Sequence, residues 1–160
     1  MVIRHAEMRD LDAVTKLEAD SFIPSEAATK EKYEYRLKNF SDCFWLLDDF
    51  GEIYSFVVCL ATDKRDLTDD MFENISIHNP DGEWLMILSV ATSPTQRHRG
   101  YAKQVMNQTI KDTKKLNRKG MVLTCKEKYI SFYAQFGFVN EGKSVSEHGG
   151  AVWYQMRLTF

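Results

Sequence analysis

The segment WLMILSVAT, residues 84–92, is a nearly continuous apolar run with the length of one β-strand. Successive side chains of a strand point to opposite faces of a sheet, so this run predicts a central strand buried on both faces. A helical pattern begins at Tyr101 and carries one apolar stripe, formed by Ala102, Val105, Met106, Thr109 and Ile110. The sequence therefore predicts a buried sheet with a helix directly after its central strand.

The other segments alternate between strand and helix patterns. Strand patterns cover residues 2–6, 44–49, 53–62, 121–125, 138–142 and 151–160. Helix patterns cover residues 10–22, 30–40 and 129–137, with a short helix near Asp69. Asp10 is expected to cap the first helix, and Gly120 to close the helix that begins at Tyr101. Hairpins mixed with helical crossovers predict one α/β (α+β) domain over residues 1–160, a mixed sheet of about six or seven strands flanked by about four helices.

Charge and cysteine content argue against several classes of function. The chain has 160 residues, with 21 Lys and Arg against 23 Asp and Glu, a formal net charge of -2. Nucleic-acid and membrane-surface proteins usually carry a basic excess, so neither partner is expected. No apolar run reaches the roughly 18 residues of a membrane span and the N-terminus has no signal-peptide pattern, which predicts a cytoplasmic protein. Cys43, Cys59 and Cys125 are predicted to be buried free thiols, and no metal site is expected.

A basic turn, TQRHRG, connects the apolar run to the helix pattern at Tyr101. The first turn of a helix has unpaired amide groups and a partial positive charge, which together bind anions. Gly100 has no Cβ to keep a phosphate from the backbone, and Ala102 keeps the next turn narrow. Donors surround the turn at Arg97, His98, Arg99 and Lys103. The turn is therefore predicted to hold a pyrophosphate group, with an ordinary basic turn as the alternative.

The same stretch resembles the acetyl-CoA loop of the GNAT acyltransferase superfamily, which follows the pattern Q/R-x-x-G-x-G/A. Arg97, Gly100 and Ala102 match this pattern, and FYAQFGF, residues 132–138, resembles the F-Y-x-x-x-G-F segment of the same fold. The predicted order of elements is also similar over essentially the whole chain. The resemblance implies a mostly antiparallel sheet splayed at its central strands, with acetyl-CoA as the co-substrate and no metal.

A narrower resemblance is to the arylalkylamine N-acetyltransferases, which acetylate serotonin-like amines. HNPDGEWLMILSVATSPTQRHRGYA, residues 78–102, and LTCKEKYISFYAQFGF, residues 123–138, align without gaps with vertebrate segments. SFIPSEAATKEKYEYRL, residues 21–37, and SVSEHGGAVWYQMRL, residues 144–158, resemble the bacterial and fungal members. This resemblance implies a small aromatic amine as the acetyl acceptor.

The superfamily resemblance also implies roles for individual residues at the cofactor. Val90, Ala91 and Thr92 match the strand edge that pairs with the pantetheine arm and polarises the thioester carbonyl. Tyr133 matches the tyrosine that lies near the sulfur and protonates the departing thiolate; phenol and thiol pKa values differ by only about 1.5 units. Packing beside neighbouring phenylalanines is the alternative for Tyr133. The residues that match the cofactor loop are Arg97, His98, Arg99, Gly100, Tyr101, Ala102 and Lys103.

The acceptor needs a base, because an aliphatic ammonium has a pKa of about 10 and must lose a proton before its nitrogen can attack at neutral pH. Vertebrate arylalkylamine enzymes carry two histidines at positions that match Met86 and Leu88, which cannot transfer protons. Insect members place a glutamate between the first two helices, which implies Glu26 as a base acting through water. A solvated loop glutamate is the alternative for Glu26, and His148 is the second candidate base. The amine pocket is predicted to be lined by Glu26 with Phe22, Tyr33 and Trp84, for which core positions are the alternative.

These features predict an acetyl-CoA-dependent N-acetyltransferase that acetylates a small primary amine, an arylalkylamine, by direct attack in a ternary complex. A polyamine, or a protein or peptide amine, remains open as the acceptor. An alternative of another class is a non-catalytic acyl-CoA-binding module. The expected partner is a small-molecule amine, and the chain is expected to be a monomer or a homodimer.

Overall fold

The computed structural model describes residues 1–160, except for the side chain of Ile75. Over these residues the strands are β1 (Val2–His5), β2 (Phe44–Asp49), β3 (Glu52–Thr62), β4 (Trp84–Thr92), β5 (Gly120–Cys125), β6 (Val139–Lys143) and β7 (Tyr154–Thr159). The α-helices are α1 (Leu11–Ser21), α2 (Lys30–Phe40), α3 (Asp70–Glu73), α4 (Tyr101–Lys115) and α5 (Ile130–Ala134). The predicted order of strands and helices is therefore confirmed.

The sheet is mixed and mostly antiparallel, as predicted. Its strand order is β1-β2-β3-β4-β5-β7-β6. β4 pairs with β5 in parallel, whereas the β1–β2, β2–β3, β5–β7 and β6–β7 pairs are antiparallel. The chain divides into two compact units: unit 1 contains Met1–Cys59 and Leu88–Thr109, and unit 2 contains Leu60–Ile87 and Ile110–Phe160. Each unit is described separately below.

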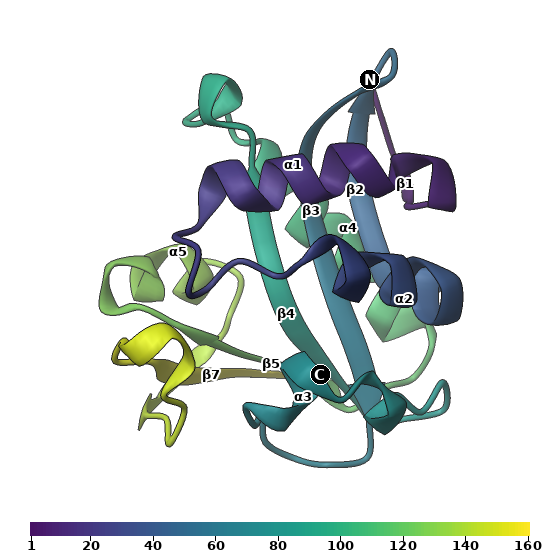
Figure 1. The fold of residues 1–160 in the computed structure, drawn as a ribbon. Helices are drawn as coiled ribbons and strands as arrows, with labels where there is room; N and C mark the ends of the chain where they lie inside the picture. Colours follow the sequence, from purple (N-terminus) through teal and green to yellow (C-terminus); the bar gives the residue numbers. More distant parts are fainter. The chain divides into compact units, whose positions relative to one another are not determined.

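Unit 1 packs helices on both faces of its strands. Figure 1 shows α1 and α2 in front of β1, β2 and β3, with α4 behind them. Tyr33 of α2 packs against Phe44 and Phe56, and the ring centroids of these three residues lie 5.4–5.8 Å apart. All three are completely buried. This aromatic cluster forms the core between α2 and the strands.

The first residues of α1 depart from the predicted capping. The helix begins at Leu11, but the Asp10 side chain makes no hydrogen bond that caps it. Its carboxylate instead accepts hydrogen bonds from the Arg4 guanidinium at 2.8 Å and from the Glu7 amide at 2.7 Å. Burial alone would raise the pKa of Asp10, but these two partners hold it below its ordinary value. The predicted cap is therefore wrong, because the carboxylate is drawn to a charged donor on β1.

Unit 2 is built around the strand β7, which pairs with both β5 and β6. Arg157 of β7 is buried, and its Nε atom lies 3.0 Å from a Glu141 oxygen. The guanidinium lies 4.7 Å from the centroid of the Trp84 ring, which is itself buried. A buried charge requires such partners. Arg157 of β7 therefore links this strand to Glu141 of β6 and to Trp84 of β4.

Gly120 does not close a helix, which is a second correction. It is the first residue of β5, and α4 has already ended at Lys115. Asn117 takes the left-handed conformation after the helix, with φ at 59°. A Cβ on Gly120 would lie 2.0 Å from the Leu158 carbonyl oxygen and 2.9 Å from the Trp84 ring. Glycine is therefore required at this position by close packing of the backbone.

Gly120→Ala is expected to lower the free energy of unfolding by about 1–3 kcal/mol, because the added methyl group overlaps the Leu158 backbone. Chemical denaturation monitored by tryptophan fluorescence measures this change. The neighbouring Lys119→Ala is the control, since it removes only an exposed ion pair with Glu83, worth about 0–1 kcal/mol. Equal stability of the Gly120 variant and the wild type would contradict the packing explanation.

Candidate active site

The loop after β4 has the backbone shape of an anion-binding turn. A short 3-10 turn, Pro94–Gln96, leads to Arg97 in an extended conformation. His98 and Gly100 have φ angles of 64° and 81°, and α4 begins at the next residue, Tyr101. A Cβ on Gly100 would meet no atom within 4 Å, so the space beside this backbone is open. The loop therefore presents exposed backbone to a ligand at the start of a long helix.

The charged side chains of this loop are all available to a ligand. Arg97, His98, Arg99 and Lys103 are exposed, while Tyr101 and Ala102 are half-buried in the first turn of α4. Arg97 is oriented by a hydrogen bond of 3.3 Å from its Nε to the Thr92 carbonyl oxygen. The structure thus brings the predicted pyrophosphate donors together around one helix N-terminus. Their arrangement suits a group with several negative charges.

The end of β4 is held by β3. The Ser55 hydroxyl donates a hydrogen bond of 2.9 Å to the Ala91 carbonyl oxygen and lies 3.0 Å from the Thr92 hydroxyl. Ala91 is buried, while Val90 and Thr92 are half-buried. β3 thus fixes the end of β4 along one edge. The opposite edge of β4 is suited to align an extended ligand.

The connector between α1 and α2, residues 22–29, carries Phe22 and Glu26. Both side chains are half-buried. A turn orders the connector, since the amides of Glu26 and Ala27 donate to the Ile23 carbonyl oxygen at 2.9 and 3.0 Å. The Glu26 Oε1 atom is itself buried. The connector therefore holds one aromatic ring and one carboxylate in an ordered segment.

Tyr33 lies in the core of unit 1, and its amide donates to the carbonyl oxygen of Thr29, the last residue of the connector, at 3.1 Å. Its side chain is completely buried, and its hydroxyl donates to Glu18 Oε1 at 2.7 Å. The same oxygen accepts a hydrogen bond from the Ser89 hydroxyl of β4 at 2.7 Å. Sequence reasoning missed both Glu18 and Ser89. The available signal was an acidic residue four positions after Val14, within the apolar stripe of a helix.

Tyr133 lies in unit 2, on α5. Its half-buried ring stacks on Phe132 at a centroid distance of 5.0 Å and meets Phe138 edge-on at 6.1 Å. Burial raises the pKa of the phenol above its ordinary value of 10.0, and nearby Cys125 raises it further. Burial also raises the pKa of the Cys125 thiol, to about 11. Tyr133 is therefore protonated at neutral pH, and Cys125 is no thiolate nucleophile.

The other two predicted residues in unit 2 pack against neighbouring side chains. The His148 ring stacks on Phe72 at 4.9 Å and lies 5.9 Å from the Trp153 ring. Trp84 is 7% exposed and is covered by the Arg157 guanidinium. Cys43, Cys59 and Cys125 are buried and free, as predicted.

The cofactor-loop pattern and the aromatic segment thus occupy a strand–loop–helix in unit 1 and a short helix in unit 2. A profile of the acetyltransferase (GNAT) family matches residues 8–138, which include both motifs. The chain belongs to the GNAT acetyltransferase family. As a GNAT acetyltransferase, it uses acetyl-CoA as its co-substrate. The open backbone at Gly100 and the exposed basic side chains beside it fit the pyrophosphate of that molecule.

Solved GNAT structures resemble the whole chain. The loading GNATL domain of CurA from Lyngbya majuscula is similar with a TM-score of 0.85 and 13% identity, over 99% of this chain and 96% of that one. The GNAT-like decarboxylase GphF in complex with isobutyryl-CoA has a TM-score of 0.83 and 17% identity, over 99% of both chains. Ribosomal-protein-alanine N-acetyltransferase from Brucella melitensis has a TM-score of 0.75 and 15% identity, over 100% of both. These likenesses show the GNAT fold. Among curated proteins, no match is found.

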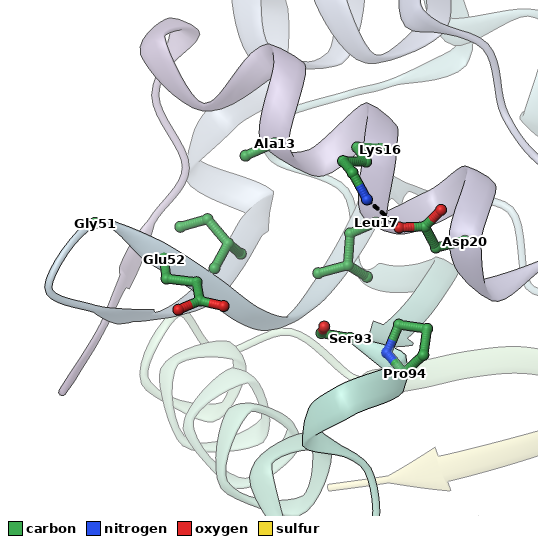
Figure 2. Close-up of a pocket in the computed structure, with 9 residues that line it drawn as sticks. Ala13, Lys16, Leu17, Asp20, Gly51, Glu52, Ser93 and Pro94 are labelled. Carbon is green, nitrogen blue, oxygen red and sulfur yellow. Dashed lines mark hydrogen bonds and ion pairs between the residues drawn. The ribbon is translucent and has the colours of Figure 1, made fainter.

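An open cavity of about 290 Å³ in this GNAT enzyme lies in unit 1, between α1, the turn before β3 and the residues after β4. Figure 2 shows Leu17, Gly51 and Ser93 around it, with an ion pair of 2.6 Å between Lys16 and Asp20 at its edge. None of the predicted substrate residues is among the residues that line it. This cavity is therefore separate from the predicted amine site.

In the part of the chain that the structure describes, no cluster of three or more His, Cys, Asp or Glu side chains is placed to hold a metal ion. None of the helices described there combines the length and the apolar character of a membrane span.

Proposed function

We propose that this GNAT enzyme transfers the acetyl group of acetyl-CoA to a small arylalkylamine by direct attack in a ternary complex. The observation that carries the proposal is the ordered connector between α1 and α2, in which Phe22 and Glu26 are half-buried. An aromatic side chain and a carboxylate are the groups that suit an aromatic ring and an ammonium in one ligand. The resemblance of residues 21–37 to arylalkylamine N-acetyltransferases supports the same acceptor.

In this mechanism the protein positions both reactants and moves two protons. The loop from Arg97 to Lys103 holds the pyrophosphate, and the edge of Val90–Thr92 aligns the thioester. Glu26 first accepts one ammonium proton through water, and the neutral amine nitrogen then forms a bond to the acetyl carbon. The carbon–sulfur bond breaks with its electron pair on sulfur, and Tyr133 gives a proton to the departing thiolate. The nitrogen loses its second proton at this step; that proton restores the Tyr133 hydroxyl through solvent, and the proton on Glu26 passes to bulk water.

The protonation state of Tyr133 suits the second proton transfer. Burial raises the pKa of its phenol above 10.0, so at neutral pH the hydroxyl carries the proton that it gives to the thiolate. The same shift makes this phenol a weaker acid than a solvent-exposed tyrosine.

Glu26→Gln is expected to lower kcat/KM for the amine by about a hundredfold, because glutamine cannot accept the proton. Steady-state kinetics with the amine as the varied substrate measures this change. Glu31→Gln, an exposed position on α2, is the matched control and is expected to keep the wild-type kcat/KM. A wild-type kcat/KM in the Glu26 variant, together with a loss of the same size in His148→Ala, would assign the base to His148.

A thiol-release assay with acetyl-CoA tests the function itself. The acceptors are tryptamine, phenethylamine, spermidine and a lysine-containing peptide, each at matched concentration. Preferential turnover of the two aromatic amines supports the proposal. Turnover of spermidine or the peptide alone rejects the arylalkylamine acceptor and keeps the acetyltransferase, with its acceptor in one of the other two classes.

A further inference from the structure

One buried carboxylate joins four parts of unit 1. Glu18, in the last turns of α1, is 3% exposed. Its Oε1 atom accepts hydrogen bonds of 2.7 Å from the Tyr33 hydroxyl of α2 and the Ser89 hydroxyl of β4. Its Oε2 atom accepts a hydrogen bond of 2.9 Å from the amide of Ala28 in the connector. Burial of a carboxylate is costly, so these three donors are needed to keep it in place.

The same residue holds both ends of the connector. The Phe22 amide donates to the Glu18 backbone carbonyl at 3.1 Å, at the point where α1 ends. The Ala28 amide donates to the Glu18 side chain six residues later. Figure 1 shows the connector running back from the end of α1 to the start of α2. Glu18 therefore closes the segment 22–28 into a loop whose ends are fixed.

The surroundings of Glu18 keep the Tyr33 hydroxyl protonated, so that it remains a hydrogen-bond donor. Burial raises the pKa of the Tyr33 phenol well above 10.0, and the Glu18 charge raises it further, so the hydroxyl stays a donor. The guanidinium of Arg36, also on α2, lies 5.1 Å from the centroid of the Tyr33 ring and is 1% exposed. It supplies a positive charge beside the Tyr33 ring. The carboxylate is thus held between polar and charged groups rather than in a purely apolar core.

We propose that Glu18 is the positioning residue of the acceptor site: it sets the shape of the connector and fixes that connector to β4. This proposal rests on the proposed function, in which the connector contributes Phe22 and Glu26 to the amine. Ser89 directly precedes Val90, the first residue of the edge that aligns the thioester. One carboxylate therefore links the part of the chain that places the amine to the strand that places the acetyl group.

An apolar side chain cannot replace this carboxylate. Glu18→Leu removes both oxygens and leaves the Tyr33 hydroxyl, the Ser89 hydroxyl and the Ala28 amide without their acceptor. Glutamine can replace it. When the glutamine oxygen accepts from the Ala28 amide, the NH2 group donates to the two hydroxyls, which accept as well as donate. Glu18→Leu therefore releases the connector together with the contacts to α2 and β4, whereas Glu18→Gln is the conservative variant that keeps them.

The experiment combines hydrogen exchange of the connector with kinetics at a temperature well below unfolding. In Glu18→Leu, we expect the amides of residues 22–28 to exchange about tenfold faster and the KM for the amine to rise about tenfold, with the Kd for acetyl-CoA unchanged. Glu18→Gln is expected to restore connector exchange and the KM close to their wild-type values. In Ser89→Ala, the Ala28 bond remains. The connector then stays protected and its amine KM stays near wild type, while kcat falls about tenfold because the link to β4 is lost.

Thr15→Val is the matched control, because it removes a hydrogen bond of 2.7 Å to Leu11 within the same helix and leaves the connector intact. It is expected to lower the Tm slightly and to leave exchange and kinetics unchanged. A lowered Tm in Glu18→Leu, with wild-type exchange and wild-type KM, overturns the proposal. If the wild type acetylates no acceptor, the proposed function fails, and connector exchange alone then decides: faster exchange supports Glu18 as the anchor and unchanged exchange overturns it.

Discussion

Gly100→Glu is expected to abolish acetyl-CoA binding. Gly100 has a φ of 81°, and a side chain there projects into the open space beside the first turn of α4. Any L-residue at this φ costs about 1–2 kcal/mol, and a carboxylate in that space repels the pyrophosphate. We expect the Kd to rise more than about a hundredfold, which corresponds to about 2.7 kcal/mol. Isothermal titration calorimetry with acetyl-CoA measures the change.

Gly51→Glu is the matched control for this variant. Gly51, in the turn between β2 and β3, also has a positive φ, 95°, and also has no atom within 4 Å of an added Cβ. Its variant carries the same kind of backbone strain and the same charge, but in the turn between β2 and β3 instead of at the first turn of α4. It is expected to bind acetyl-CoA with wild-type affinity. Unchanged affinity of the Gly100 variant would reject the assignment of the phosphate loop.

Tyr133→Phe is expected to lower kcat about a thousandfold with little change in the KM for the amine, because it removes the proton donor and keeps the ring. The pH profile gives a second test. Burial raises the pKa of Tyr133 above 10.0, and the acid is active in its protonated form. Its contribution is therefore complete below pH 10.0 and is lost only as the pH rises beyond the raised value. No alkaline decline from Tyr133 is expected between about pH 7 and 9.

Tyr129→Phe is the control for Tyr133, because Tyr129 is 47% exposed and lies one helical turn before it. This variant is expected to keep the wild-type kcat. Stopped-flow release of CoA separates the chemical step from product release in both variants. A wild-type kcat in Tyr133→Phe would assign Tyr133 to packing with Phe132 and Phe138.

Local patterns predicted the fold well. The bounds of α2, residues 30–40, and of β4, residues 84–92, are those that the apolar spacing indicated. Both segments carry signals within a few residues: a helical stripe in one and a continuous apolar run in the other. The cofactor-loop pattern is local in the same sense, because the strand, turn and first helical residues that form it are consecutive. The family match covers these residues.

The errors arose where distant residues decide the structure. Asp10 looked like a helix cap, but Arg4 on β1 takes its carboxylate. Gly120 looked like a helix end, but the backbone of Leu158 excludes every larger residue. Glu18 carried only a weak signal, because its three donors come from positions 28, 33 and 89 and meet only in the folded chain. Sequence pattern could not bring these residues together.

The loop that Glu18 closes has a consequence for how acceptor range can change. Residues 23–27 lie between two anchored ends, the last turn of α1 and the Ala28 amide. Doubling the length of a flexible loop costs only about 0.6 kcal/mol, so insertions in this segment are expected to be tolerated. Under the proposed function, libraries that vary this segment while keeping Glu18 and the base Glu26 would change the acceptor site and leave the acetyl-CoA loop unchanged. The range of acceptors would then be altered through one short segment that a single residue holds at both ends.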